Sequence, residues 1–236
     1  MKLSRLITKA ADTAMPHIDK CVACSIEKGV ESFLCKRCCD EINARKHGDT
    51  KAKDLCAFSV YDYEGLVSKV VRDYKYNGKR YLCAYIASEM AAAVKGDYSA
   101  ICHVPLHKKR LRRRGFDQAE LLAKGIAKIT DIPFVRAAKR TRNTRTQVSL
   151  GLVQRQENMK GAFVSTGPIS GNVVLVDDVL TTGATAAECA AVLLGAGASD
   201  VFVLTFARST GDATRKRKWS VRKMFDILKP RNFRSK

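Results

Sequence analysis

The sequence has few acidic residues and no long apolar run. It contains 23 Asp and Glu against 43 Lys and Arg, a formal net charge of +20. This excess of positive charge indicates polyanionic partners, although a generally basic protein would also show it. No stretch approaches the roughly 18 apolar residues of a membrane span. The first twelve residues intersperse charges among apolar residues, unlike a secretory signal. We therefore expect a cytoplasmic protein without a membrane span.

The nine cysteines do not indicate a disulfide framework, because they are unevenly spaced and 236 residues can bury a core without covalent support. Two C-x2-C pairs lie ten residues apart near the N-terminus, and four thiolates satisfy a tetrahedral Zn²⁺ ion. Such a site leaves no open position, so we predict structural zinc in a small zinc-ribbon module over residues 15–50. Cys39 makes the fourth ligand ambiguous by one position, and redox-active or merely buried thiols are the alternative. The candidate ligands are Cys21, Cys24, Cys35 and Cys38.

Residues 51–210 alternate short apolar stretches with segments of helical periodicity. This alternation predicts an α/β domain in which helices flank a parallel sheet, with ligands at the carboxyl ends of the strands. The expected strands are residues 55–63, 100–104, 132–137, 173–176 and 201–206. The expected helices are residues 65–74, 82–94, 116–129 and 186–194.

The most informative stretch, Val173 to Thr185, reads V-V-L-V-D-D-V-L-T-T-G-A-T. Four apolar residues suit a buried parallel strand, and we expect Asp177 and Asp178 at its end. The Thr-Thr-Gly-Ala-Thr that follows predicts a tight turn into a helix, whose N-terminal N–H groups and dipole attract phosphate. The two acids can accept hydrogen bonds from sugar hydroxyls or reach a magnesium ion. The stretch therefore predicts a phosphoribosyl ligand; the alternative is a Thr-capped helix of any doubly wound fold.

Two further stretches are strongly basic. Six of the seven residues from Lys108 to Arg114 are cationic, and such density is costly unless an anion neutralises it. At a strand end these side chains would meet a pyrophosphate, which arginine binds bidentately; a solvated loop or a nucleic-acid patch are the alternatives. The polar stretch 139–147 has little apolar content to anchor it. It suits either a lid over the phosphate site or an arm that grips nucleic acid.

A basic tail, residues 211–236, ends the chain. From Asp212 to Lys236 it holds ten Lys and Arg against two Asp, with interspersed aromatic residues. Cations that contact phosphates and aromatics that stack on bases are typical of single-strand binding. A docked C-terminal helix and a helix on anionic lipid are the second and third interpretations. The candidate nucleic-acid-binding residues of the whole chain are Arg112, Arg113, Arg114, Arg142, Arg145, Arg215, Lys216, Arg217, Lys218 and Trp219.

Val173 to Thr185 resembles the signature of type I phosphoribosyltransferases, which bind phosphoribosyl pyrophosphate (PRPP). Further motifs, in family order, resemble the ComF family, whose members include a cytoplasmic competence protein implicated in handling single-stranded DNA during natural transformation. The resemblance covers about residues 20–208, with Asp117 where many relatives carry Asn. The motifs are Tyr63-x-Gly65, Lys75-Tyr76-x-Gly78, Val104-Pro105-Leu106, Arg110-Leu111, Arg114-Gly115-Phe116-x-Gln118-x-x-x-Leu122-Ala123, Thr144-x-x-Gln147, Arg155-x-x-Asn158 and Gly161-Ala162-Phe163.

The resemblance implies a type I phosphoribosyltransferase-like fold that binds PRPP with Mg²⁺. It implies that Asp177 and Asp178 bind the ribose hydroxyls. The residues implied to bind the 5-phosphate are Thr181, Thr182, Gly183, Ala184 and Thr185, and those on the pyrophosphate side include Lys108, Lys109 and Arg110. We expect both acids to face solvent at the strand end, so that Asn at both positions weakens PRPP binding and leaves the fold intact.

Two functions follow from the resemblance. The first is a PRPP-binding, zinc-containing protein that handles single-stranded DNA in competence, with a DNA-uptake helicase as a further partner. The alternative is a metabolic enzyme that transfers ribose 5-phosphate from PRPP to a small base or amine. The sequence shows no second-substrate site and no N-terminal catalytic cysteine. His103 and His107 flank the basic stretch and could assist proton transfer or be bystanders, so the sequence leaves turnover open.

Overall fold

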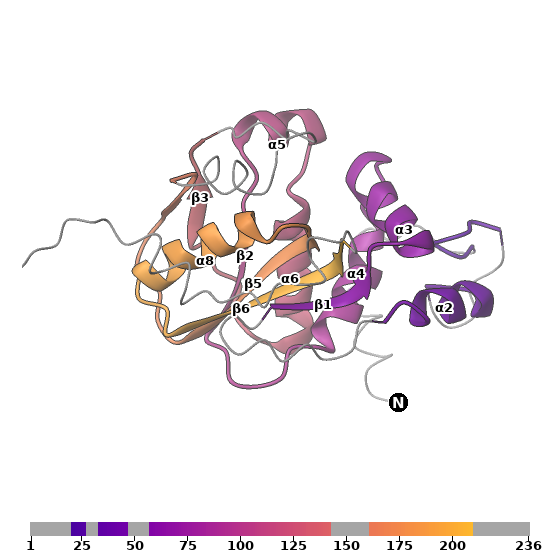
Figure 1. The fold of residues 1–236 in the computed structure, drawn as a ribbon, viewed down its shortest axis with the longest axis horizontal. Coiled ribbons are helices and arrows are strands. Elements are labelled where there is room, and N and C mark those ends of the chain that lie inside the picture. Colours follow the sequence, from indigo (N-terminus) through magenta and orange to yellow (C-terminus); the bar gives the residue numbers. More distant parts are fainter. Residues whose placement is uncertain (1–19, 27–32, 47–56, 143–160, 210–236) are drawn as a thin grey trace, which may run out of the picture.

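The computed structural model describes residues 20–26, 33–46, 57–142 and 161–209 (Figure 1). In these ranges four parallel strands form one sheet in the order β1-β6-β5-β2, and two short antiparallel strands form a second sheet. The strands of the main sheet are β1 (Ala57–Asp62), β2 (Ala100–His103), β5 (Asn172–Leu180) and β6 (Asp200–Arg208), and the pair consists of β3 (Ala138–Arg140) and β4 (Phe163–Ser165).

Helices cover both faces of the main sheet, as the alternation of side chains along β5 requires. Val174 and Val176 belong to the core on one face, with α3, α4 and α6. Val173 and Leu175 belong to the core on the other face, with α8 and the β3–β4 pair (Figure 1). The helices are α3 (Gly65–Tyr76), α4 (Leu82–Ala91), α6 (Gln118–Thr130) and α8 (Ala184–Gly195). The predicted parallel sheet flanked by helices is confirmed.

The cysteine-containing segment packs against the α3–α4 side of the molecule. It ends in α2 (Lys36–Asn43), and its buried apolar residues share one core with β1, α3 and α4. The Lys69 ammonium donates to the Ala23 carbonyl at 2.6 Å, and the rings of Phe33 and Tyr85 lie 5.9 Å apart between centroids. The segment is therefore held by the same core as the sheet. The predicted domain boundaries at residues 50 and 210 lie outside the described residues.

Three local expectations differ from the structure. Residues 132–137 do not form a strand: Phe134 makes a single parallel bridge to Ile101, because Pro133 lacks an N–H and β2 is only four residues long. β5 continues through both acids to Leu180, because β6 pairs with it that far.

Lys108–Arg114 forms a short helix, α5. His107 caps its first turn, and the helix ends at Gly115, where φ is 80°. A left-handed glycine at this position is a common way to end a helix.

No helix within the described ranges combines the length and the apolar character needed to cross a bilayer.

Candidate functional site

A pocket forms where β2 stops pairing with β5. The Val104 N–H donates to the Val176 carbonyl at 2.9 Å, whereas the next N–H in register, that of Leu106, donates to the Asp117 carboxylate at 2.8 Å and not to β5. On the other side, β6 pairs with β5 up to Leu180. From Asp177 onward, β5 is therefore open on the β2 side. A pocket of about 220 Å³ lies at this point. It is at the carboxyl ends of the strands, where ligands bind in open α/β sheets.

Charged side chains from several elements line this pocket. They comprise five cationic and three acidic residues, an excess of positive charge that suits an anionic ligand. They are Lys75 of α3, Arg110, Arg113 and Arg114 of α5, Asp117 before α6, Arg140 of β3, and Asp177 and Asp178 of β5.

Asp178 is ion-paired inside the pocket. Its Oδ1 lies 2.8 Å from the Lys75 Nζ, and the residue is 8% exposed, so the expectation of a solvent-facing carboxylate is wrong. Burial alone would lower the pKa of Lys75, but the attraction of Asp178 outweighs it and raises that pKa above its ordinary value. The sequence placed Lys75 in a family motif without giving it a role, because nothing in the chain order shows that α3 reaches β5.

Asp177 lies in a different environment from its neighbour. Its Oδ1 accepts a hydrogen bond from the Asp178 N–H at 2.8 Å. Burial and the adjacent Asp178 carboxylate raise the pKa of Asp177 to about 8, against the opposing effect of Lys75. At neutral pH Asp177 therefore tends to keep its proton, beside the Asp178 carboxyl that is paired with Lys75. Together they can donate to and accept from the two hydroxyls of a sugar diol.

Several arginines line the same pocket as the two acids. Arg140 is 9% exposed, and burial together with the nearby Arg110 lowers its pKa to about 10. Burial and the neighbouring arginines of α5 likewise lower the pKa of Arg110. Convergence of like charges in a partly buried site is unfavourable, and a bound phosphate would relieve it.

The Thr-rich turn leads into α8 as expected. Gly183 has a φ of 74°, and α8 begins at the next residue. This left-handed conformation is one that glycine adopts without strain. Thr185, in the first turn of α8, lines the pocket. Of the described residues before it, Thr181, Thr182, Gly183 and Ala184 do not line it in this structure.

The set of α5 residues that line the pocket differs from the set that the sequence analysis assigned to PRPP. The pocket includes Arg110, which we expected there, and also Arg113 and Arg114, which we assigned to nucleic acid. These three are spaced i, i+3 and i+4 and so share one helix face. The described residues Lys108, Lys109 and Arg112 are exposed and do not line the pocket, and neither does Arg142. Arg145 and the tail residues from Arg215 to Trp219 lie outside the described residues.

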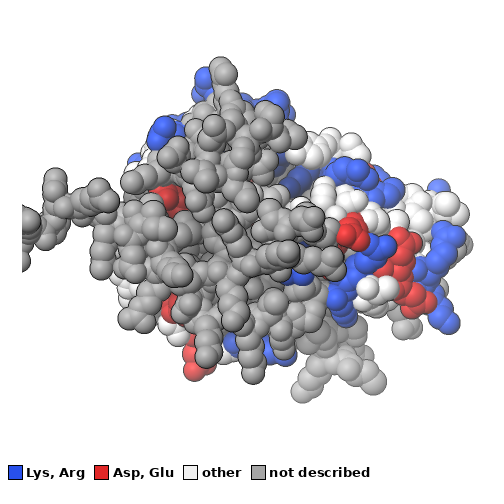
Figure 2. All heavy atoms as spheres, viewed as in Figure 1, with Lys and Arg blue, Asp and Glu red and all other residues white. Residues whose placement is uncertain are grey.

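Lys and Arg side chains gather at the edge of the molecule where α5 lies, whereas basic and acidic side chains intermingle near α2 and α3 (Figure 2). No residue of α5 is buried. The helix therefore presents one face to the pocket and the rest of its positive charge to solvent.

The two candidate histidines are not part of the pocket lining in the described chain. His107 accepts a hydrogen bond from the Lys109 N–H at its Nδ1 and so caps α5. His103 is 5% exposed and packs on the Phe134 ring, and burial lowers its pKa, so it is neutral at physiological pH.

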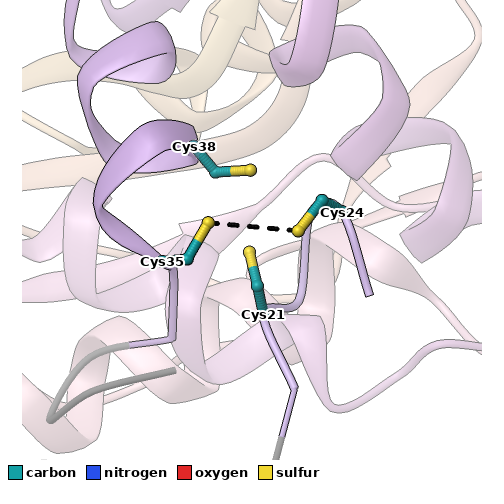
Figure 3. Close-up of side chains that lie close together, drawn as sticks. All are labelled: Cys21, Cys24, Cys35 and Cys38. Atoms are coloured by element: carbon teal, nitrogen blue, oxygen red, sulfur yellow. Dashed lines mark hydrogen bonds between the residues drawn. The ribbon is translucent and has the colours of Figure 1, made fainter. Parts of the chain in front are cut away.

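Four cysteines converge beside α2 (Figure 3). The sulfur atoms of Cys21, Cys24, Cys35 and Cys38 all lie within 4.8 Å of one another, and those of Cys24 and Cys35 are 3.9 Å apart. Four sulfurs at about 2.3 Å from a tetrahedral zinc ion lie about 3.8 Å apart, so the cluster fits that ion. Cys39 is not a member: its sulfur accepts a hydrogen bond from the Asn43 amide at 3.2 Å. Burial and the other three thiols raise the pKa of Cys38 above its ordinary range.

The comparisons return relatives named for DNA use and competence. DNA utilization protein YhgH of Salmonella typhi is 31% identical over 203 residues, which are 82% of this chain and 86% of that protein. Competence protein F of Haemophilus influenzae is 38% identical over 117 residues, 47% of this chain and 50% of that protein. Competence protein ComFC of Bacillus subtilis is 28% identical over 160 residues, 64% of this chain and 63% of that protein.

Among solved structures, the glutamine PRPP amidotransferase of B. subtilis matches with a TM-score of 0.40 and 20% identity, over 56% of this chain and 30% of that one. No protein-family model matches the chain.

Replacing each of the two adjacent acids by Asn should change the free energy of unfolding in opposite directions. Between about pH 4 and pH 8 the unfolded chain ionises Asp177 but the folded protein does not, so stability falls as the pH rises through this window. Asp177→Asn has no carboxyl to titrate here, so its stability should not fall in this way. Its unfolding free energy should therefore exceed that of the unmodified protein by more at pH 8.5 than at pH 4.5. Asp178→Asn leaves Lys75 without its carboxylate and should cost up to about 3 kcal/mol at neutral pH. Urea unfolding measures both; equal destabilisation by the two changes would contradict this assignment.

Proposed function

The chain belongs to the ComF family, and from that premise we propose that it is a cytoplasmic PRPP-binding protein with a structural zinc ion that handles single-stranded DNA in competence. The observation that supports PRPP binding best is the pocket beside Asp177. Its lining includes the two carboxyls and Thr185, together with Arg110, Arg113 and Arg140. A sugar diol suits the carboxyls, and a pyrophosphate suits the arginines.

The α5 helix offers a matched test of PRPP binding. Arg113 lines the pocket and its neighbour Arg112 does not, although both are exposed arginines. Arg113→Ala should weaken the binding of PRPP–Mg²⁺ by about tenfold or more, since it removes a charge-assisted hydrogen bond to phosphate. Arg112→Ala should change the affinity less than twofold.

Calorimetric titration of both variants and of the unmodified protein, with and without Mg²⁺, measures these affinities. Equal losses of PRPP affinity in the two variants would show only a general effect of positive charge. An unmodified protein that gives no heat of binding with PRPP would exclude the PRPP site.

The cysteine cluster would hold the zinc ion. Four thiolates complete a tetrahedral shell, so the ion would supply folding energy and no catalytic position. The shared core supports this role, because the buried cysteine segment carries few large apolar side chains of its own and packs directly against α3 and α4.

Adjacent cysteines give the control for zinc. Cys38→Ser should lower the metal content of the purified protein from one zinc per chain to well below one, and should lower the midpoint of thermal unfolding. Cys39→Ser should leave both unchanged, because Cys39 lies outside the cluster. Elemental analysis and thermal unfolding provide the two readings. Retention of zinc by Cys38→Ser, or its loss from Cys39→Ser, would contradict the ligand assignment.

Single-stranded DNA binding is supported by the net charge of +20 and by the solvent-facing cations of α5, Lys108, Lys109 and Arg112. These residues lie next to the pocket but outside it, so DNA and PRPP need not compete for the same side chains. The relatives named for DNA use and competence point to the same partner.

The DNA role predicts a salt-dependent affinity. A fluorescent single-stranded oligonucleotide should bind with a log affinity that falls linearly with log salt, by about 0.7 for each phosphate contacted. A Lys108→Ala, Lys109→Ala, Arg112→Ala variant should bind more weakly and show a shallower slope, while its affinity for PRPP stays within about twofold of the unmodified protein. Anisotropy at several salt concentrations measures both properties. No binding at low salt, or an unchanged slope in the variant, would rule out this surface.

A further inference from the structure

A second pocket lies at the amino ends of the strands, at the edge of the sheet opposite the two acids. Ser99, directly before β2, and Asn172, the first residue of β5, both line it. Its volume is about 710 Å³. The proposed function makes no use of this amino-edge pocket, because the phosphoribosyl ligand lies at the carboxyl ends of the same strands.

Apolar side chains form part of the amino-edge pocket. Val94, Tyr98 and Ile132 line it and pack against the main core, yet each of them is only partly buried. Each therefore keeps apolar surface in contact with solvent, and a docked apolar segment would remove that surface from water.

Acidic residues surround the amino-edge pocket, although the chain as a whole is strongly basic. Asp97 lines it, and Asp131 lies between two lining residues. Asp200 pairs in register with Asn172, and all three acids are exposed. Among the lining residues and their immediate neighbours in the chain, Lys95 alone is basic. α6 ends here at Thr130, and the carboxyl end of its dipole adds negative potential. The pocket therefore suits a partner that is both basic and apolar.

The basic tail carries both properties in a regular pattern. Residues 210–236 lie outside the described part of the structure, but the sequence places Val221, Met224, Phe225 and Leu228 at positions i, i+3, i+4 and i+7. This spacing predicts a helix with one apolar face, and Pro230 would end it. Contacts with DNA phosphates need no such apolar face, so the pattern favours burial against protein. The cations along one border of the apolar face are Lys218, Arg222 and Lys229.

The tail is long enough to reach the amino-edge pocket of its own molecule. β6 begins at the amino edge with Asp200 and ends at the carboxyl edge with Arg208. Its nine residues span about 30 Å. Residues 210–220, which precede the apolar pattern, can span at most about 40 Å when extended. The chain can therefore return along the outside of the domain to the edge where β6 began.

We propose that residues 221–228 form a helix that docks its apolar face in the amino-edge pocket of the same chain, with the bordering cations beside the acids. Attachment through the chain gives the tail a high effective concentration at the pocket, so a modest interface is sufficient.

The single tryptophan of the chain, Trp219, lies next to this apolar pattern and reports on the tail. Time-resolved fluorescence anisotropy of the full-length protein distinguishes a tail that tumbles with the domain from one that moves independently within nanoseconds. A docked tail should give a slow decay. The decay should stay the same when the protein is diluted about a hundredfold, because the contact is within one chain.

Two matched pairs of variants test the contact. Phe225→Ser removes an apolar side chain from the docked face and should lower the ratio of docked to free tail by about tenfold or more. Phe233→Ser, beyond Pro230, should leave the decay unchanged. Asp97→Lys reverses a charge of the pocket and should free the tail at low salt, whereas Lys95→Glu should not. Asp97 and Lys95 are both exposed, so neither change disturbs the core.

Several outcomes would overturn this inference. A slow decay that persists in both Phe225→Ser and Asp97→Lys would show that the tail docks elsewhere. A slow decay that is lost on dilution would place the tail in the pocket of a second copy. A fast decay in the unmodified protein would show that the tail does not dock. If a single-stranded thymidine oligonucleotide, or vesicles of phosphatidylcholine and phosphatidylglycerol, then slowed that decay, the tail would belong to that partner. None of these readings involves PRPP, so the inference can fail without the proposed function failing.

Discussion

β5 has two neighbours that stop pairing with it at different points, and the site depends on that difference. β2 pairs with β5 as far as Val176, after which the Leu106 N–H donates to Asp117 instead, while β6 continues to Leu180. Asp177 and Asp178 are thereby held in rigid extended backbone with one side open. Had β2 continued, hydrogen-bonded backbone would fill the space that the pocket occupies. The cations of α3, α5 and β3 meet the two acids in this gap.

The electrostatics of the gap follow from this geometry. Lys75 pairs with Asp178, burial and the adjacent Asp178 raise the pKa of Asp177, and the arginines of α5 and Arg140 leave an excess of positive charge. Two adjacent carboxyls of different environment suit the hydroxyls of a sugar, and the cluster of arginines suits phosphates. The pocket thus already separates a region of carboxyls from a region of arginines, as the proposed phosphoribosyl ligand requires. The cysteine cluster shares one buried core with α3 and α4, and α3 also carries Lys75 of the pocket.

Local patterns in the sequence predicted the elements that carry the site but not the contacts between them. Four apolar residues, two acids and a Thr-Gly turn predicted β5 and the start of α8, and two C-x2-C pairs predicted the cysteine cluster. The ion pair of Lys75 with Asp178 joins residues far apart in the chain, so no local pattern reveals it. The sequence predicted Arg110 beside the ligand, but that Arg113 and Arg114 line the same pocket depends on the basic stretch being a helix. Once it is a helix, the spacing of Arg110, Arg113 and Arg114 places all three on one face.

Hydrogen–deuterium exchange with and without PRPP tests the central claim most directly, because it reports where on the chain the ligand acts. A sugar phosphate in the gap beside β5 should slow exchange in residues 177–186 and in α5, and should leave β1 and the cysteine segment unchanged. Exchange that is unaltered in residues 177–186 at a PRPP concentration that saturates binding would place the ligand elsewhere and contradict the account.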